Sequence, residues 1–317
     1  MKTILAGCSP CSRAHRSQRG VAIIMAILVT ALAASLSSVL LLRTDRWLNQ
    51  VALSQQYAQT RELARSALDY AIAILQEDAR RSVVDHLGED WARRLPPISA
   101  EGGEIEGYIE DLQGRWNLNN VHAWNHAEPN SLRISQRLFE LNDLEPMLAH
   151  VLLDWVDAND QSHGSFGAES SYYRSGQPPY TAANVPLSSI ATLERLKGFE
   201  VDDVARLRPY ASALPGVQAV NVNTAPAKVL AAIVPGLNLA QANELVDHRK
   251  TSYYRNVADF RKQLPNPDVL ITHPVVTQSY YFLVHVRARY GKARASLQAL
   301  VQRRSSNKPK IYWISLN

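Results

Sequence analysis

One polar segment of the sequence, residues 154–173, has the composition of a binding site for a hard cation. Its oxygen donors include Asp154, Asp157, Asn159, Asp160 and Glu169. Calcium takes six to eight oxygen ligands from carboxylates, amides and backbone carbonyls. The spacing is not that of an EF-hand, because Ser162 and Ala168 stand where the turn glycine and the last acid belong. The segment therefore predicts either another kind of calcium loop or a solvated polar loop whose carboxylates cap helices.

No enzymatic constellation competes with this loop. The sequence has no zinc-protease, phosphate-loop or dinucleotide motif, and residues 164–167 lack the nucleophile-elbow pattern. His122 and His126 stand four residues apart, but their neighbours predict a polar loop rather than a zinc-binding helix face. Cys8 and Cys11 have no further cysteines to complete a metal site. We therefore expect no enzyme, and a membrane-anchored hydrolase is disfavoured because no nucleophile has a recognisable base.

The N-terminus carries a charged leader that ends at Gly20, directly before an uncharged apolar segment from Val21 to Leu42. These 22 residues would rise about 33 Å as a helix, enough to span a hydrocarbon core. A secretory signal cleaved near residues 31–34, or an uncleaved anchor, would also explain an apolar run. A glycine before the run instead resembles the leader of type IV pilin-like proteins. In that class, prepilin peptidase cuts after the glycine and methylates the new N-terminus, which here would be Val21.

The basic character of the chain lies in its leader. Residues 1–20 hold 4 of the 34 basic residues and no acid, so 34 − 4 = 30 basic residues face 29 acidic ones after cleavage. A nearly neutral mature chain gives no support to nucleic-acid binding. Basic residues before a first membrane helix predict that this end stays in the cytoplasm. We expect a single-pass inner-membrane protein whose C-terminal domain lies in the periplasm.

The hydrophobic pattern predicts an α+β fold in which a long N-terminal helix packs on an antiparallel sheet. Apolar residues continue at helical spacing beyond the membrane segment to about residue 83, and the second half is amphipathic. Alternating segments predict strands over residues 104–112, 281–288, 293–302 and 311–314. The sequence between these two groups of strands is typical of helices. The parsimonious interpretation is one pilin-like domain that carries a large, mostly helical insert.

The predicted organisation has five parts. They are a prepilin leader over 1–20, a transmembrane helix over 21–42, the helix and first strands of the pilin-like domain over 43–120, the inserted helical domain over 121–275, and C-terminal strands over 276–317.

Within the insert, residues 221–249 resemble a helix-hairpin-helix unit, a module that often binds DNA phosphates through backbone N–H groups. The match departs at the hairpin, where Asn238 replaces the second glycine. The next turn has Gln241, Asn243 and Glu244 instead of a lysine or arginine. Phosphate binding needs basic neighbours and close backbone approach. We interpret the unit as a scaffold or a protein-contact module and expect no nucleic-acid partner.

Several motifs in order resemble one family, the minor pseudopilin K of type II secretion (general secretion pathway protein K). Besides the pilin-like N-terminus, they lie at residues 114–119, 154–157, 167–169, 182–184, 208–215 and 222–225. The resemblance implies a pilin-like domain with a large helical insert, and calcium bound in the loop after Asp154. It implies Asp157, Asn159 and Glu169 as the main ligands, with Asp154 and Asp160 beside them. The family usually has an aspartate where Asn159 stands, which predicts weaker calcium binding here.

Met25 is the fifth residue after the proposed cut, where most pilin-like proteins have a glutamate. That glutamate pairs with the N-terminal ammonium of a neighbouring subunit, because an unpaired carboxylate in the membrane is costly. Its absence resembles protein K, which implies a place at the pseudopilus tip with minor pseudopilins I, J and H. The alternative hypothesis is a minor pilin or competence-type pseudopilin that contacts DNA through the helix-hairpin-helix-like unit.

Overall fold

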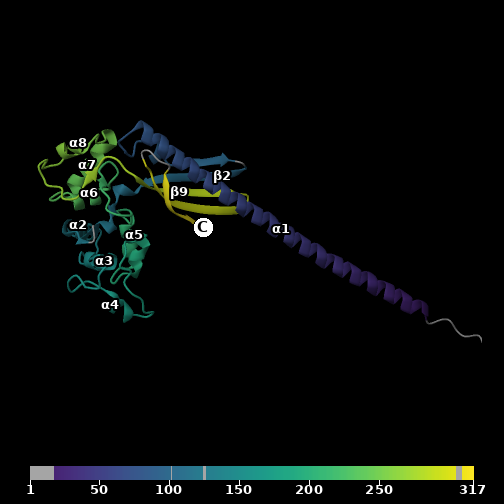
Figure 1. Cartoon of the computed structure of the whole chain (residues 1–317). Coiled ribbons are helices and arrows are strands. Elements are labelled where there is room, and N and C mark those ends of the chain that lie inside the picture. The colour runs from purple at the N-terminus through teal and green to yellow at the C-terminus, as the bar shows by residue number, and fades with distance from the viewer. Residues whose placement is uncertain (1–17, 101, 124–125, 305–308) are drawn as a thin grey trace, which may run out of the picture. The chain divides into compact units, whose positions relative to one another are not determined.

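The computed structural model describes residues 18–100, 102–123, 126–304 and 309–317. Cys8, Cys11 and most of the predicted leader lie outside the described residues. The chain divides into two compact units, residues 1–58 and 59–317. Helix α1, Gln18–Arg81, begins in the first unit and ends in the second (Figure 1). The predicted long N-terminal helix is therefore confirmed, with its end within two residues of the expected position.

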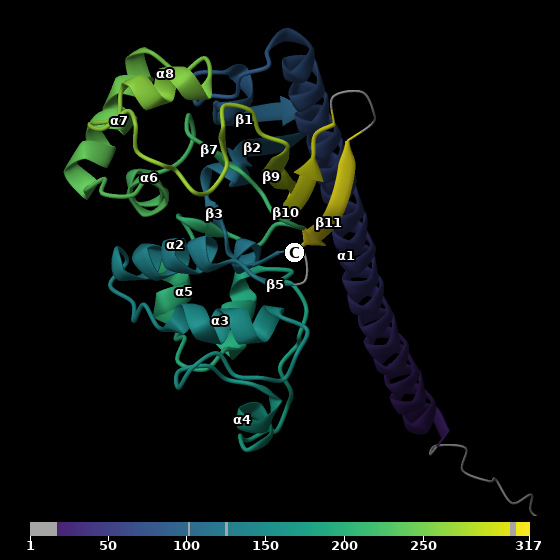
Figure 2. The same cartoon turned by 60° about the vertical axis from the view of Figure 1, so that its left-hand side comes forward.

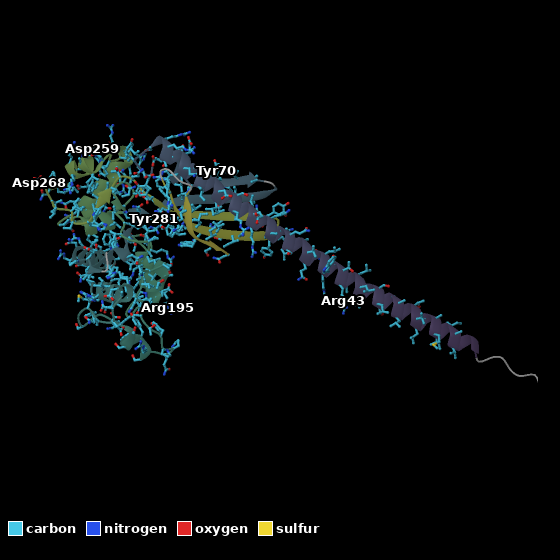
Figure 3. The ribbon with its side chains drawn as sticks, in the orientation of Figure 1. Arg43, Tyr70, Arg195, Asp259, Asp268 and Tyr281 are labelled. Atoms are coloured by element: carbon cyan, nitrogen blue, oxygen red, sulfur yellow. The ribbon has the colours of Figure 1, made fainter. Side chains whose placement is uncertain are left out.

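The described part of the first unit is residues 18–58 of α1, which include the apolar segment from Val21 to Leu42. Its side chains project outward from the helix in Figure 3. The aliphatic ones are exposed, among them Val21 at 59% and Met25 at 61%. The hydroxyls of Ser35 and Ser38 donate to carbonyls one turn earlier, so the segment's own backbone satisfies them. Among the described residues, one helix, Gly20–Arg81, is long and apolar enough to cross a membrane, with a window of mean hydropathy 2.4. This helix is a candidate membrane anchor.

The second unit contains a five-stranded antiparallel sheet whose strands come from both ends of the chain. Its strand order is β1-β2-β9-β10-β11. The strands are β1 Leu95–Ala100, β2 Gly103–Asp111, β9 Tyr281–Tyr290, β10 Ala293–Gln302 and β11 Lys310–Leu316. The predicted α+β class is confirmed, including the hairpin between β9 and β10, whose turn places Gly291 at a φ of 57°. Strand β1 was not predicted, because Pro96 and Pro97 are residues that rarely occur inside strands.

The last turns of α1 cover one face of this sheet. Leu63, Leu68 and Leu75 are buried against alternate residues of β9 and β10. The strand residues in this cluster include Phe282, Val284, Val286, Leu297, Ala299 and Val301. Apolar residues recur about every 3.6 residues along the helix and every second residue along the strands, so each element has one apolar face, and these two faces pack together. This core belongs to the pilin-like part of the chain.

The segment between β2 and β9 contains the remaining helices. They are α2 Pro129–Glu140, α3 Leu148–Val156, α4 Ser170–Arg174, α5 Val201–Leu207, α6 Ala227–Ile233, α7 Leu239–Thr251 and α8 Val257–Lys262. Short 3-10 helices lie at Asp90–Ala92, Leu112–Gly114, Leu118–Val121 and Ile190–Arg195. In Figure 2 the helices gather beside the strands in two groups, α6–α8 and α2–α5. Helices are thus the main regular elements of the insert, as predicted.

Three two-residue strand pairs interrupt the insert. β3 Trp116–Asn117 pairs in parallel with β6 Ala211–Ser212, and β7 Val220–Asn221 pairs in parallel with β8 Val275–Val276. β4 His122–Ala123 pairs antiparallel with β5 His126–Ala127. The polar loop predicted around His122 and His126 was therefore wrong. Backbone pairing holds the two histidines in a short hairpin, which four-residue spacing cannot reveal.

The core of the insert begins before residue 121, the predicted start of the helical domain. Trp116 and Leu118 are fully buried in the same cluster as α2, α3 and α6. Asn117, Asn119 and Asn120 of the same segment are buried as well. The buried cluster of α2, α3 and α6 therefore also includes side chains that precede residue 121.

Side chains of buried asparagines form hydrogen bonds with the backbone of the loops of the insert. Asn119 donates to the carbonyls of Leu187 and Leu214 and accepts from the Leu187 amide at 2.8 Å. Asn120 makes both amide hydrogen bonds to the backbone of Gln218, at 2.9 and 3.0 Å. A carboxamide offers a donor and an acceptor side by side, so it can replace a strand partner for an irregular backbone. The hydrogen bonds of Asn119 with Leu187 hold the segment around residue 187 in place, and Asn184 of the same segment donates to the carbonyl of Asn159, just after α3.

Candidate metal centre

Helix α3 brings two aspartates of the polar loop together. Asp154 lies in its last turn, and Asp157 is its C-cap, one turn later on the same side. The helix is apolar around them and packs into the core, so both carboxylates are buried, with 0% and 2% of their residue surfaces exposed. The loop then returns to Glu169, the N-cap of α4, which is 4% exposed. Three carboxylates therefore lie in the protein interior, where an unneutralised charge is costly.

Trp155 and Tyr173 hold α3 and α4 in this arrangement. Their rings meet edge to face at 5.2 Å between centroids, and Tyr180 stacks on Tyr173 at 5.1 Å. Lys197 ties the loop from the other side, because its ammonium donates to the carbonyls of Phe166 and Gly167 at 3.1 and 3.4 Å. The aromatic contacts and the Lys197 hydrogen bonds thus position the elements that carry the carboxylates.

Gly167 allows the loop to close over the carboxylates. A Cβ atom at this position would collide with Oδ2 of Asp154 and Oγ of Ser162. Its backbone therefore lies directly against a carboxylate oxygen, an approach that only glycine permits.

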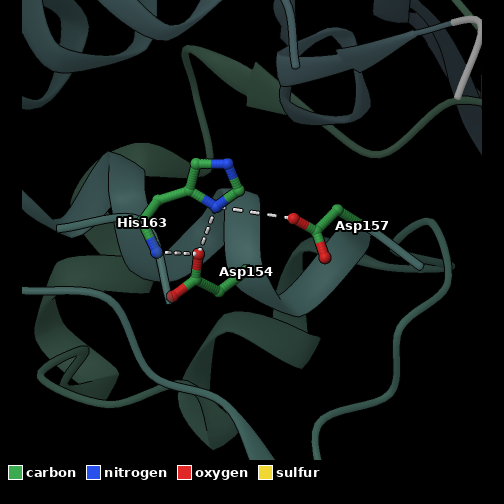
Figure 4. A group of neighbouring side chains, drawn as sticks. All are labelled: Asp154, Asp157 and His163. Carbon is green, nitrogen blue, oxygen red and sulfur yellow. Dashed lines mark hydrogen bonds and ion pairs between the residues drawn. The ribbon is translucent and has the colours of Figure 1, made fainter. Parts of the chain in front are cut away.

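His163 joins the two aspartates, as Figure 4 shows. Its Nδ1 lies 2.8 Å from Oδ1 of Asp154 and 3.5 Å from Oδ2 of Asp157, and its backbone N–H also donates to Oδ1 of Asp154. Ligand atoms of these three residues all lie within 4.8 Å of one another. The sequence analysis missed His163, which stands nine residues after Asp154, a separation that matches no helical or strand period.

Three carboxylate oxygens in this group lack a donor. Oδ2 of Asp154 and both carboxylate oxygens of Glu169 are buried and accept no hydrogen bond from any described residue. Burial and the negative charges of Asp154, Asp157 and Asp160 raise the pKa of Glu169 to about 8. Burial also raises the pKa of Asp157. Oxygens without partners beside like charges are what a bound cation would neutralise.

Asn159 and Asp160 lie on the exposed part of the same loop. Oδ1 of Asn159 accepts from the Gln161 amide at 2.8 Å, and Oδ1 of Asp160 accepts from the Ser170 amide at 3.1 Å. This last hydrogen bond is the main cause of the lowered pKa of Asp160. The backbone carbonyl of Asn159 accepts from the Asn184 amide at 3.0 Å. Of the five predicted ligands, the structure thus brings Asp154 and Asp157 within reach of one ion, and their charges act on Glu169. The Asn159 side chain accepts a hydrogen bond within a turn, and that of Asp160 accepts one from across the loop.

The donor set fits calcium better than a softer metal. Asp154, Asp157 and Glu169 offer carboxylate oxygens, whereas His163 already interacts with the aspartates through Nδ1. A hard cation takes oxygen ligands, and a hydrogen-bonded imidazole would orient a ligating carboxylate from behind. These residues would hold Ca²⁺ and order the loop around it.

A second acidic cluster lies between the end of α1 and the sheet. Asp78, Asp85 and Glu89 again place carboxylate oxygens within 4.8 Å of one another. Here, however, the fully buried Arg303 donates to Asp78 at 2.7 Å and to both oxygens of Asp85 at 2.5 and 2.7 Å. Glu89 accepts from the Trp91 indole at 2.7 Å. The protein supplies its own cation to this cluster.

The predicted helix-hairpin-helix unit is formed by α6 and α7. Asn238 caps α7 by accepting from the Gln241 amide at 2.9 Å, and Gln241 accepts in return from the Asn238 amide. Arg137 of α2 donates to the carbonyls of Ala231 and Leu237 at 2.6 and 2.7 Å. The hairpin is thus satisfied by its own caps and joined to the insert, in agreement with a scaffold.

Comparison with known proteins gives the family. Two family models described as "Type II secretion system (T2SS), protein K" match residues 114–216 and 220–275. The type II secretion system protein K of Pseudomonas aeruginosa is 33% identical over 311 residues, 94% of this chain and 92% of that protein. The protein K of Klebsiella pneumoniae is 32% identical and covers 95% and 99%. This chain belongs to the protein K family of type II secretion systems. The predicted resemblance is confirmed.

The fold comparison agrees with the family. The chain has a TM-score of 0.76 and 21% identity to a chain in "The Crystal Structure of the GspK-GspI-GspJ complex from enterotoxigenic Escherichia coli Type 2 Secretion System". The match covers 84% of this chain and 99% of the other. The chain therefore has the same fold as that protein over most of its length. The polar loop lies inside the first matched family model.

Proposed function

We propose that this protein K is the minor pseudopilin at the tip of the type II secretion pseudopilus. There it helps to initiate assembly and so supports protein export across the outer membrane, as a structural component without catalytic activity. Its partners are the minor pseudopilins I, J and H and the inner membrane. The E. coli protein of the same fold was crystallised as a GspK-GspI-GspJ complex, which supports the choice of partners.

The observation that carries the proposal is Met25. In the fibre, each carboxylate at this position is expected to pair with the N-terminal ammonium of the next subunit. Met25 is an apolar side chain, exposed on the membrane half of α1. It offers no charge for another N-terminus, so no subunit is expected above this one.

A substitution tests the position. Met25→Glu should let the protein enter the fibre away from its end, whereas Met25→Leu should leave it at the tip. Cross-linking of fibres in cells, followed by immunogold labelling, would show where each variant lies. Tip placement of Met25→Glu at the same frequency as the wild type would overturn the argument from Met25.

Maturation follows from the same N-terminal signal. We propose that prepilin peptidase cuts between Gly20 and Val21 and that Val21 is N-methylated in the mature protein. The charge-free segment that follows Gly20 is helical from the cut onward, so the mature chain begins as a membrane helix. Mass spectrometry of the N-terminus should find methylated Val21. An intact leader, or a cut near Ala34, would contradict this route.

Calcium is proposed as the ion of the buried carboxylates. Asp154, Asp157 and Glu169 would bind it, with Asn159 and Asp160 completing the shell from the exposed side of the loop. The support is the set of buried oxygens that no described donor satisfies. The bound ion would fix the loop between α3 and α4 in the periplasmic domain.

A further inference from the structure

A cleft of about 630 Å³ lies on the face of the five-stranded sheet that α1 does not cover. Its floor includes Tyr108, Glu110 and His285, which alternate along β2 and β9 with residues buried against α1. Its wall comes from the insert, from residues 188–190 and from α5 and the segment that follows it to residue 213. Ligand sites commonly have volumes of roughly 300–1,000 Å³. The cleft is therefore large enough for a short segment of another molecule.

The floor of the cleft is held by stacked side chains. The rings of Tyr108 and His285, paired across β2 and β9, are stacked with their centroids 4.3 Å apart. The Arg94 guanidinium lies over the Tyr108 ring, 4.4 Å from its centre. Nε2 of His285 lies 3.0 Å from Oε2 of Glu110. Because each of these side chains is held by its neighbours, a ligand would bind without ordering them first.

Both acidic side chains that line the cleft already have partners within the protein. Besides its contact with His285, Glu110 forms an ion pair with Arg115 at 3.1 Å. Glu106 forms an ion pair with Arg287 at 3.3 Å. The negative charge of the cleft is therefore neutralised by these two arginines.

Two further arginines that line the cleft, Arg94 and Arg208, pair with no carboxylate among the described residues. Arg94 lies directly before β1, in the pilin-like part, whereas Arg208 is the C-cap of α5 in the insert. Both side chains are exposed, so the cleft has uncompensated positive charge on both of its sides. Ser212 also lines the insert side, and its buried hydroxyl has no hydrogen-bond partner among the described residues.

We propose that this cleft binds an extended acidic segment of an exported protein, whose carboxylates pair with Arg94 and Arg208. The source of the segment rests on the proposed function. A guanidinium binds a carboxylate through two parallel N–H donors, so arginine suits this ligand better than lysine would. Permanent subunit interfaces are largely apolar at their centre. Because this cleft has charged side chains on its floor and on its wall, a transient ligand fits it better than another subunit of the fibre.

Peptide binding tests the cleft. The probe is a fluorescein-labelled peptide of alternating glutamate and alanine, and a second peptide has glutamine in place of glutamate. Fluorescence anisotropy with the full chain in detergent should show binding of the glutamate peptide alone, and added salt should weaken it. The double substitution Arg94→Gln and Arg208→Gln should weaken this binding roughly tenfold. Equal binding of the two peptides, or no effect of the double substitution, would overturn the proposal.

The matched control is Arg255→Gln. Arg255 is an exposed arginine outside the cleft, and it too pairs with no carboxylate among the described residues. Its substitution removes the same charge and should leave peptide binding unchanged. An equal loss in Arg255→Gln would show that the peptide responds to net charge and not to the cleft, which would also overturn the proposal.

Competition decides the source of the segment. The glutamate peptide should stay bound when minor pseudopilins I and J join the complex. Its displacement by I and J would make a pseudopilin the occupant, and its displacement by an excess of this unlabelled chain would make a second copy the occupant. Either result would overturn an exported protein as the source. If I and J form no complex with the chain, the proposed partners fail, whereas peptide binding by the cleft is still decided by the anisotropy measurement.

Export in cells gives the final test. The double variant Arg94→Gln and Arg208→Gln should lower the amount of exported protein in the medium at least roughly threefold, while fibres assemble as in the wild type. Unchanged export would overturn the role of the cleft. Loss of fibre assembly in the double variant would place the cleft in a contact between subunits and would overturn the proposal as well.

Discussion

Two acidic clusters in the second unit have nearly the same composition but solve the problem of buried charge differently. In one, Arg303 lies inside the cluster and donates to Asp78 and Asp85. In the other, oxygens of Asp154 and Glu169 have no donor among the described residues. Carboxylate density alone therefore does not identify a cation site. The hydrogen-bond partners of each oxygen do, because a buried anion must find positive charge inside the protein or from solution.

The cluster around Arg303 also joins the two parts of the second unit. Asp85 accepts from the Ser279 amide at 2.7 Å, and the Ser279 hydroxyl donates to Asp111 at 2.6 Å. Asn221, from the insert, donates to the same carboxylate at 3.1 Å. This network reaches from α1 through the sheet to the insert, so it should act on global stability.

The largest effect should come from removing the internal cation. Arg303→Leu leaves Asp78 and Asp85 without their buried partner, which should lower the free energy of unfolding by about 3–5 kcal/mol. Urea denaturation of the full chain in detergent measures it. Arg304→Leu is the control, because Arg304 is exposed and contacts Gln302. A loss in Arg303→Leu no larger than in the control would show that the cluster is not held by this arginine.

Calcium should act on the loop and not on the Arg303 cluster. If calcium binds only the folded state, a free calcium concentration of a hundred times the dissociation constant should raise the free energy of unfolding by about 2.7 kcal/mol. Glu169→Gln should abolish this gain, whereas Glu89→Gln should keep it. The midpoint of thermal unfolding, measured with calcium and with EDTA, gives the comparison. A calcium response that survives Glu169→Gln would place the ion elsewhere.

Without calcium, the same two clusters should respond to neutralisation with opposite signs. Burial and neighbouring acids raise the pKa of the Glu169 carboxyl group to about 8. Folding without calcium therefore forces this group to take up a proton at neutral pH, a cost that Glu169→Gln avoids, so the substitution should stabilise the calcium-free protein by on the order of 1 kcal/mol. Asp85→Asn removes a partner of Arg303 and should destabilise it. Destabilisation by Glu169→Gln in EDTA would indicate that its oxygens already have donors.

The Arg303 cluster should also give a pH dependence. Burial and the charges of Glu89 and Asp85 raise the pKa of Asp78 to about 6, above its ordinary value of 3.8. The folded state then binds more protons than the unfolded state, so stability should fall as the pH rises from about 4 to about 6, by on the order of 2 kcal/mol. Asp78→Asn should flatten this part of the curve, measured in saturating calcium. A wild-type stability that rises over this range would contradict the assigned direction.

The smallest effect should come from Asn159. Asn159→Asp adds a carboxylate to the exposed side of the loop and should tighten calcium binding by roughly threefold to tenfold, because ligand charge sets the affinity of such sites. Calorimetric titration measures it, with Asn130→Asp as a control outside the loop. Unchanged affinity would show that Asn159 does not face the ion.

The fold was largely predictable because its signals are local. The apolar run after Gly20 and the alternation in β9 and β10 each lie within a short continuous stretch of the chain. Strand β1 escaped prediction because of Pro96 and Pro97, and the hairpin at His122 because its paired segments are only two residues long. The start of the insert core at Trp116 depends on contacts with distant helices.

The sequence by itself determined the apolar N-terminal helix, the α+β class, the family and the acidic character of the polar loop. Only the tertiary structure decided which acids meet. Asp154 and Asp157 share a helix turn, but the return of Glu169, the position of His163 and the closure at Gly167 depend on packing of α4 against α3. The same holds for Arg303, which is 225 residues from Asp78 and yet donates to it. Charges interact through space, so a sequence shows that acids are present but not whether a cation of the protein already satisfies them.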